Sequence, residues 1–307
     1  MSAAWVAVGV RSTAMRRRRL GPAAVRAVAA SPSLDTALAT LLSGPYGHDV
    51  RADQSLADAQ RAVVATLVWN LRVLAGWAPH AGVTTLRACA ATIEVINVDD
   101  HLRAITDASA PAPYRLGALA TAWPRLAAAS DSAGLRRALA QSRWGDPGSD
   151  DRHDISIAMR LSLAERISVE VPAARAWAAG AAALVLAREL AYRRDAIGAR
   201  TRLTVSRVLG PTAADAGSLS ELRSALPVAA RWALADADEP DELWRAEIAW
   251  WARVDRDAGA LSRHGGPDSQ TLVGTVAMLA VDAWRVRAAL ELAARGGGRL
   301  EDFDAVA

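Results

Sequence analysis

Apolar residues at steps of three and four recur along almost the whole chain, and this spacing restricts its fold more than any other feature. The clearest case is the stripe Val64, Leu67, Val68, Leu71 and Leu74, which would line one face of a helix. No segment shows a sustained alternation of apolar and polar residues between two turns, as a half-buried strand would. We therefore predict an all-α chain.

Capping and turn residues place the expected helices. Ser31-Pro32-Ser33 and Ser55 are typical starts, and Gly44-Pro45-Tyr46-Gly47 is a typical turn. The helices are expected over 2–30 with an interruption at Gly21-Pro22, 33–43, 55–77, a segment after Gly82 that ends at Arg103, 113–128, 131–142, 155–168, 172–198, 200–209, 218–236, 240–262 and 269–295, with one more turn expected over 300–306.

Charge and cysteine usage exclude several classes of protein. All 36 basic residues are Arg, yet the net charge is only +3, so composition alone does not indicate a nucleic-acid partner. Arg16 to Arg19 would point all round a helix and form no single basic stripe. The single Cys89 lies in an apolar helix, which indicates an inert buried thiol and excludes an internal disulfide.

No segment has the pattern of a leader or a membrane span. The short apolar run Ala3 to Val10 precedes its Arg cluster, the reverse of a secretory signal. The uncharged stretches 176–187 and 269–281 have 12 and 13 residues, whereas a span needs about 20. We expect a cytoplasmic protein that reaches a membrane only through partners.

Catalytic signatures are missing. With no Lys there is no phosphate-binding loop, and no Gly-x-Ser-x-Gly elbow occurs. His101 near Asp99 and Asp100, and His153 among aspartates, are interpreted as solvated polar residues, and no metal or other cofactor is expected. Five tryptophans gather late in the chain and are interpreted as core anchors, with contact to a partner helix as the alternative: Trp232, Trp244, Trp250, Trp251 and Trp284.

The stretch Glu94 to Arg103 is expected to close a long apolar helix with a run of charge. We interpret it as a solvated, salt-bridged helix end. The alternative is the magnesium motif of all-helical prenyl-chain enzymes, with Asp99, Asp100 and Asp107 as ligands of a metal that binds a diphosphate. Such enzymes need a second cluster on a facing helix, and the sequence offers none.

Two landmarks recur along the chain and predict three related units. Aromatic turns follow short helices at Tyr46, Trp144 and Trp232, which are 98 and 88 positions apart (46, 144, 232). Charged helix ends begin at Glu94, Asp195 and Asp282, which are 101 and 87 apart (94, 195, 282). We predict three helical units at 1–108, 109–209 and 210–307.

On these landmarks the chain resembles the C/d family of V-type ATPase subunits, the connector between the central stalk and the membrane rotor ring. The match consists of an aromatic and an Arg in the first helix, a short helix ending in an aromatic turn and its second copy, a Glu-x-x-Asn helix with a following Arg, and a C-terminal acid and Arg before a Gly-rich end. The residues are Trp5, Arg11, Leu41, Tyr46, Glu94, Asn97, Arg103, Trp144, Asp282 and Arg287. The sequence departs from the pattern where Gly44 replaces Thr and Arg285 replaces Asn.

The resemblance implies three similar helical bundles around a pseudo-threefold axis, forming a funnel. It implies a non-catalytic subunit of a rotary ATPase that couples the central shaft to the ion-carrying rotor ring during proton or sodium transport. Its partners would be central-stalk and rotor-ring subunits on the inner face of the membrane. Two alternatives stay open: the all-α isoprenoid-type enzyme using Asp99 and Asp100 with magnesium, and a helical adaptor that kept the fold and lost the ATPase.

Overall fold

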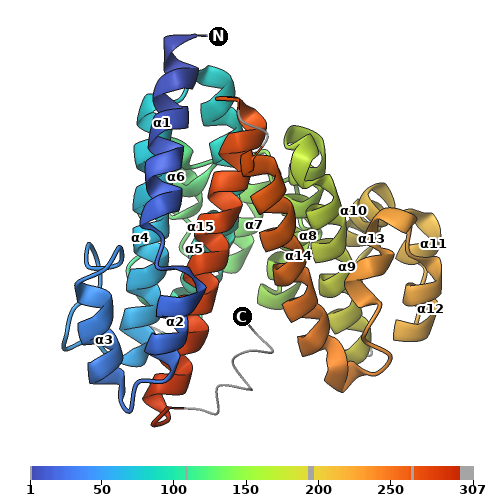
Figure 1. Cartoon of the computed structure of the whole chain (residues 1–307). Coiled ribbons are helices and arrows are strands. Elements are labelled where there is room, and N and C mark those ends of the chain that lie inside the picture. The colour runs from blue at the N-terminus through green and yellow to red at the C-terminus, as the bar shows by residue number, and fades with distance from the viewer. Residues whose placement is uncertain (1, 108–109, 193–196, 264–265, 298–307) are drawn as a thin grey trace. The chain divides into compact units, whose positions relative to one another are not determined.

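A computed structural model describes residues 2–107, 110–192, 197–263 and 266–297. Helices are the only regular secondary structure in these ranges (Figure 1), so the all-α prediction is confirmed. Backbone contacts divide the chain into two compact units, one of residues 1–86 and 251–307 and one of residues 87–250. Each unit is described by itself, and the division into three units at 1–108, 109–209 and 210–307 stays a prediction.

The first unit joins the two ends of the chain. Its helices are α1 (Ala3–Arg18), α2 (Gly21–Ala29), α3 (Leu34–Leu42), α4 (Leu56–Trp77), the start of α5 (His80–Asp107), the second half of α14 (Leu243–Arg263) and α15 (Ser269–Ala294). The C-terminal helix α15 packs against α1, α2, α3 and α4 (Figure 1). Their apolar faces enclose a core that includes Val25, Leu38, Leu41, Val63 and Leu290, all fully buried.

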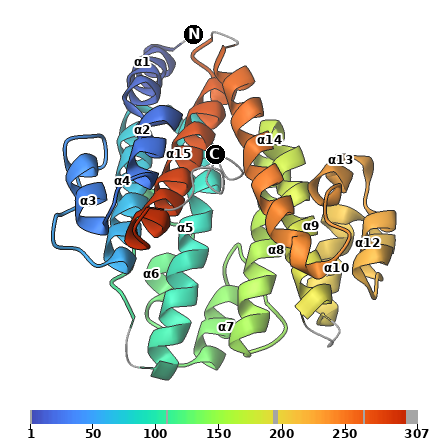
Figure 2. The ribbon, with the colours of Figure 1, turned by 60° about the horizontal axis from the view of Figure 1, so that its bottom comes forward.

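The second unit contains the rest of α5, the start of α14 and the segments between them. These are the 3₁₀ turn η1 (Gly117–Leu119), α6 (Trp123–Leu126), α7 (Ser132–Ala140), α8 (Arg152–Glu170), η2 (Pro172–Ala174), α9 (Arg175–Tyr192), α10 (Ala199–Leu209), α11 (Pro211–Ala214), α12 (Leu219–Ala225), α13 (Val228–Arg231), η3 (Trp232–Leu234) and η4 (Pro240–Glu242). The long helices α8 and α9 pack together, and α10 lies against both (Figure 2).

Side-chain caps start the helices where the sequence predicts them. Ser33 accepts a hydrogen bond from Thr36 N at the start of α3, and Ser55 accepts one from Asp58 N at the start of α4. Each hydroxyl satisfies an N–H that the first turn of a helix leaves without a partner. The predicted interruption before Pro22 is also present, since α1 ends at Arg18 and α2 begins at Gly21.

Two predicted helices are wrong because the backbone is broken inside them. The segment 113–128 holds only η1 and α6, since Gly117 has a φ of +55° and Ala120 is extended. The segment 218–236 breaks at Leu226, which is extended before Pro227. A proline disfavours helical geometry in the residue before it.

Other boundaries differ less. Helix α5 continues to Asp107 instead of ending at Arg103, so the stretch from Glu94 lies within the helix. The predicted helix over 172–198 begins with η2, and α9 runs to Tyr192. The predicted turn over 300–306 and Asp195 lie outside the described residues.

Candidate functional site

Glu94 is the centre of a buried hydrogen-bonded arrangement in the second unit. Its side chain is fully buried, and its two carboxylate oxygens accept hydrogen bonds from Thr121 N (2.6 Å), Ala122 N (2.8 Å) and Trp144 Nε1 (2.7 Å). A buried carboxylate is stable only when such donors replace its water. We call these four residues the Glu94 clamp. The expectation of a solvated helix end is therefore wrong for Glu94.

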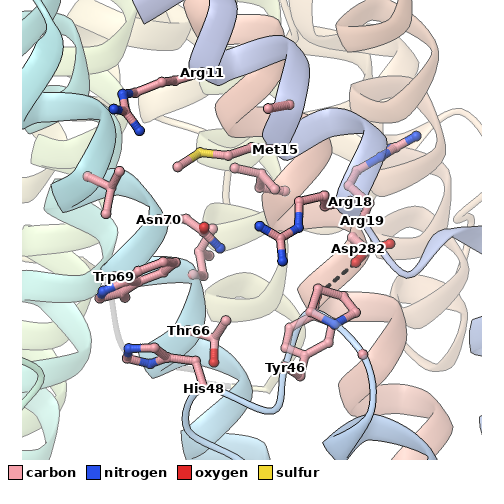
Figure 3. Close-up of a pocket in the computed structure, with 16 residues that line it drawn as sticks. Arg11, Met15, Arg18, Arg19, Tyr46, His48, Thr66, Trp69, Asn70 and Asp282 are labelled. Carbon is pink, nitrogen blue, oxygen red and sulfur yellow. Dashed lines mark hydrogen bonds between the residues drawn. The ribbon is translucent and has the colours of Figure 1, made fainter.

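Asp282 on α15, in the first compact unit, has partners of the same kinds as Glu94: two backbone N–H groups and one aromatic side chain. Its oxygens accept hydrogen bonds from Leu20 N (3.2 Å), Gly21 N (2.9 Å) and Tyr46 Oη (2.9 Å), as Figure 3 shows for Tyr46. Both Asp282 and Tyr46 are buried. Burial and the neighbouring Asp282 charge raise the pKa of the Tyr46 phenol well above 10.0. We call these residues the Asp282 clamp.

The two clamps share one chemistry. In each clamp, a carboxylate on a long helix accepts hydrogen bonds from two consecutive backbone N–H groups and from the N–H or O–H group of one aromatic side chain. The ring follows a short capped helix at the same distance, since Tyr46 lies 13 residues after the cap Ser33 and Trp144 lies 13 after the cap Asp131. The first two aromatic turns thus share their hydrogen bonds as well as their spacing.

The third aromatic turn is built differently. Trp232 lies 14 residues after the cap Ser218, but its indole N–H donates to Ala229 O at 2.7 Å. Its ring packs instead against Gly180 of α9, where a Cβ would lie 2.6 Å from Trp232 Cζ2. The acid predicted for this copy, Asp195, lies outside the described residues.

Polar side chains three positions after Glu94 and Asp282 make further contacts. They are Asn97 and Arg285. Asn97 is buried, donates to Tyr114 O (3.0 Å) and accepts from Tyr114 N (2.8 Å). Arg285 replaces Asn in this pattern and pairs with Asp255 of α14, with Nη1 and Oδ2 at 3.1 Å. Asn97 thus contacts a loop, whereas Arg285 contacts another helix.

The structure brings only some of the predicted pattern residues together. Trp5 lies against Gly82, Arg11 stacks on the Trp77 ring at 3.8 Å, and Leu41 belongs to the first core. Arg103 pairs with Asp100. Arg287 is exposed and has no hydrogen bond or ion pair with the described residues.

Arg166 was not predicted from the sequence, yet it contributes to the Glu94 clamp. Its side chain is largely buried, stacks over the Trp144 ring at 4.9 Å and lies 3.7 Å from Glu170. The sequence carries no signal of this burial, because Arg166 directly follows Glu165 and the two would be interpreted as a solvated charged pair.

Two of the residues proposed as magnesium ligands, Asp99 and Asp100, form ion pairs with arginines. Asp99 Oδ2 lies 2.7 Å from Arg160 Nη2, and Asp100 pairs with Arg103. The Asp107 side chain lies outside what the structure describes. In the described part of the chain, no three His, Cys, Asp or Glu side chains gather as metal ligands. His101 contacts Ala129 O, and His153 contacts Glu189.

The tryptophans and the cysteine are the remaining candidates. Trp232 and Trp250 pack against the core of the second unit, and Trp251 stacks on Trp284 with ring centroids 5.1 Å apart. Trp244 is 52% exposed, so its prediction as a core anchor is wrong. Burial raises the pKa of the Cys89 thiol to about 12, so it is a poor nucleophile near neutral pH.

No family model matches the chain, and no curated protein matches it significantly. In the described ranges, no helix combines the length and apolar character needed to cross a bilayer.

Proposed function

We propose that the chain is a non-catalytic connector in a V-type rotary ATPase, which couples the central shaft to the membrane rotor ring during ion transport. In this proposal its three helical units surround a pseudo-threefold axis and form a funnel. The proposal is motivated by the resemblance of the pattern residues to the C/d family and is supported by the order in which the clamps link the units.

The contacts of the three aromatic turns follow a cyclic order when they are assigned to the three proposed helical units. These are unit one (1–108), unit two (109–209) and unit three (210–307), and they differ from the two compact units described above. Glu94 of unit one holds Trp144 of unit two. Gly180 of unit two accommodates Trp232 of unit three. Asp282 of unit three holds Tyr46 of unit one. In each case a long helix of one unit contacts the aromatic turn of the next, which is the connectivity that a closed ring of three repeats requires.

This cyclic order is the observation that carries the proposal. A connector that transmits torque has to resist deformation, and well-packed helices joined by hydrogen-bonded carboxylates such as Glu94 and Asp282 supply stiffness. The role needs no reactive group, and the assignment of the acids to hydrogen-bonded clamps leaves them no catalytic task. We place the protein at the inner face of the membrane, held there by its partners.

The test is to recover the protein with its neighbours. An affinity-tagged full chain is expressed in its native host, the membranes are dissolved in a mild detergent, and copurifying proteins are identified by mass spectrometry. We expect central-stalk and catalytic subunits together with small membrane-spanning ring subunits. The double variant Glu94→Gln/Asp282→Asn should lose them, whereas Arg72→Gln, at an exposed arginine of α4 outside the family pattern, serves as the control and should keep them. Recovery of a lone monomer, or ATP hydrolysis by the purified chain itself, would contradict the proposal.

A further inference from the structure

A recess beside the Asp282 clamp carries positive charge that the protein does not neutralise. It has a volume of about 380 Å³ and is lined by α1, α4, α15 and the turn around Tyr46 (Figure 3). Arg11, Arg18 and Arg19 contribute to its lining, against a single carboxylate, Asp282. All of these residues belong to the first unit.

The acidic groups at the recess are already occupied. Asp282 accepts hydrogen bonds from two backbone N–H groups and from Tyr46. Asp49, next to the lining residue His48, accepts a hydrogen bond from Thr66 Oγ1 (2.9 Å) and lies 2.8 Å from His48 Nδ1. Neither carboxylate pairs with an arginine, so the guanidinium charge stays available to an anion from solution.

Arg18 is the group that most directly offers this charge. Figure 3 shows its side chain extending from α1 over Tyr46 toward Asn70. Among the described residues, neither Arg18 nor Asn70 has a hydrogen bond or an ion pair. The recess therefore presents a guanidinium fork and a side-chain amide, two groups that donate hydrogen bonds to phosphate oxygens.

The rest of the lining suits an organic group attached to the anion. Trp69 is 41% exposed and stacks on His48, with ring centroids 4.5 Å apart. Met15 and Val73 add apolar surface. Ligand pockets usually span about 300–1,000 Å³, so the volume fits a small molecule.

We propose that this recess binds a small phosphate ester, with Arg18 and Asn70 on the phosphate and Trp69 beside the organic group. The inference rests on the recess alone and does not depend on membership in a rotary ATPase. It also gives part of the Arg16 to Arg19 run a role, since Arg18 and Arg19 line this recess while Arg16 and Arg17 line another surface hollow on α1.

Isothermal titration of the full chain at low salt tests the proposal, with glucose 6-phosphate and pyrophosphate as probes and glucose as the uncharged match. Glucose 6-phosphate should bind with a dissociation constant below about 1 mM, and glucose should not bind. Arg18→Gln should weaken binding at least about tenfold, because a charge-assisted contact is lost. Asn70→Ala should weaken it several-fold.

Arg17→Gln is the matched control, because Arg17 is the exposed neighbour of Arg18 and lines the other hollow. It should bind the probes as the wild type does. The inference is overturned if neither probe binds and phosphatidic acid vesicles do not bind either, or if Arg17→Gln loses as much affinity as Arg18→Gln.

Vesicle flotation distinguishes the source of the phosphate. Binding to phosphatidylcholine vesicles that contain phosphatidic acid, lost in Arg18→Gln and retained in Arg17→Gln, would support the site with a lipid headgroup as its ligand. Binding of the soluble probes without flotation would support the site with a free phosphate ester. Circular dichroism checks that each variant is folded.

Discussion

Replacing Glu94 by Gln tests the Glu94 clamp with the smallest possible change in shape. One Glu94 oxygen accepts two hydrogen bonds, from Ala122 N and Trp144 Nε1, and the other accepts one from Thr121 N. A glutamine can keep its oxygen toward the first pair, but its NH₂ group then faces the Thr121 N–H. The variant therefore places two donors against each other in a buried site.

The expected cost follows from the contacts. A buried donor left without an acceptor costs about 1–3 kcal/mol, and the two remaining bonds weaken by about 1 kcal/mol once the acceptor is neutral. The free energy of unfolding should fall by about 2–4 kcal/mol, out of about 5–15 kcal/mol for a typical domain. Arg166 above Trp144 also loses a nearby negative charge, which acts in the same direction.

Urea unfolding followed by circular dichroism measures this loss, and amide hydrogen exchange localises it to Thr121 and Ala122. Asp99→Asn is the matched control on α5, because the Asp99–Arg160 pair is partly exposed and such pairs contribute about 0–1 kcal/mol. A double-mutant cycle with Trp144→Phe isolates the contact between carboxylate and indole. If Glu94→Gln costs no more than Asp99→Asn, or leaves the exchange of both amides unchanged, the clamp does not hold the loop.

Three further predictions concern single sites. The pKa of the Tyr46 phenol is near 10.0 in the unfolded chain and is raised in the folded chain, so the wild type loses stability as pH rises from about 9 to about 11. Tyr46→Phe lacks this phenol, so its melting temperature should fall less over the same pH range, and equal slopes for both proteins would refute this. Gly180→Ala should lower the free energy of unfolding by about 1–3 kcal/mol through its contact with Trp232, whereas Gly76→Ala, with open space around the new Cβ, should be neutral or stabilising in a urea titration. Cys89 is half-buried, and it should react with Ellman's reagent at pH 8 much more slowly in the folded chain than after unfolding, because desolvation raises the pKa of its thiol to about 12; equal rates for the folded and unfolded chain would contradict this.

Local signals in the sequence were sufficient to predict most of the helices. The stripe on α4 and the caps Ser33 and Ser55 depend only on neighbouring residues, so both helices begin where the sequence predicts them. The Glu94 stretch was placed at a helix end because charge clusters usually face water. It lies within α5 instead, because distant donors from Thr121, Ala122 and Trp144 replace the water.

The same cause explains the wrong helix over 113–128. Tyr114, Thr121 and Ala122 direct their backbone N–H groups to Asn97 and Glu94, so side chains on α5 supply partners that a helix would have found within itself. No periodicity in the segment 113–128 reports those partners. The recess at Arg18 was equally hidden, since it depends on α1, α4 and α15 coming together.

The two clamps show how one hydrogen-bond pattern can be built from different residues. Each clamp requires one buried acceptor for two backbone N–H groups and one aromatic hydrogen, and this requirement is met by Glu94 with Trp144 and by Asp282 with Tyr46. Residue identity can therefore change while the hydrogen-bond pattern stays. The third aromatic, Trp232, satisfies its own N–H locally, which removes the need for an acid there. The two clamps keep donors and acceptors while their residue types differ, so spacing is the signal that remains in the sequence, and the prediction of three units rests on that spacing.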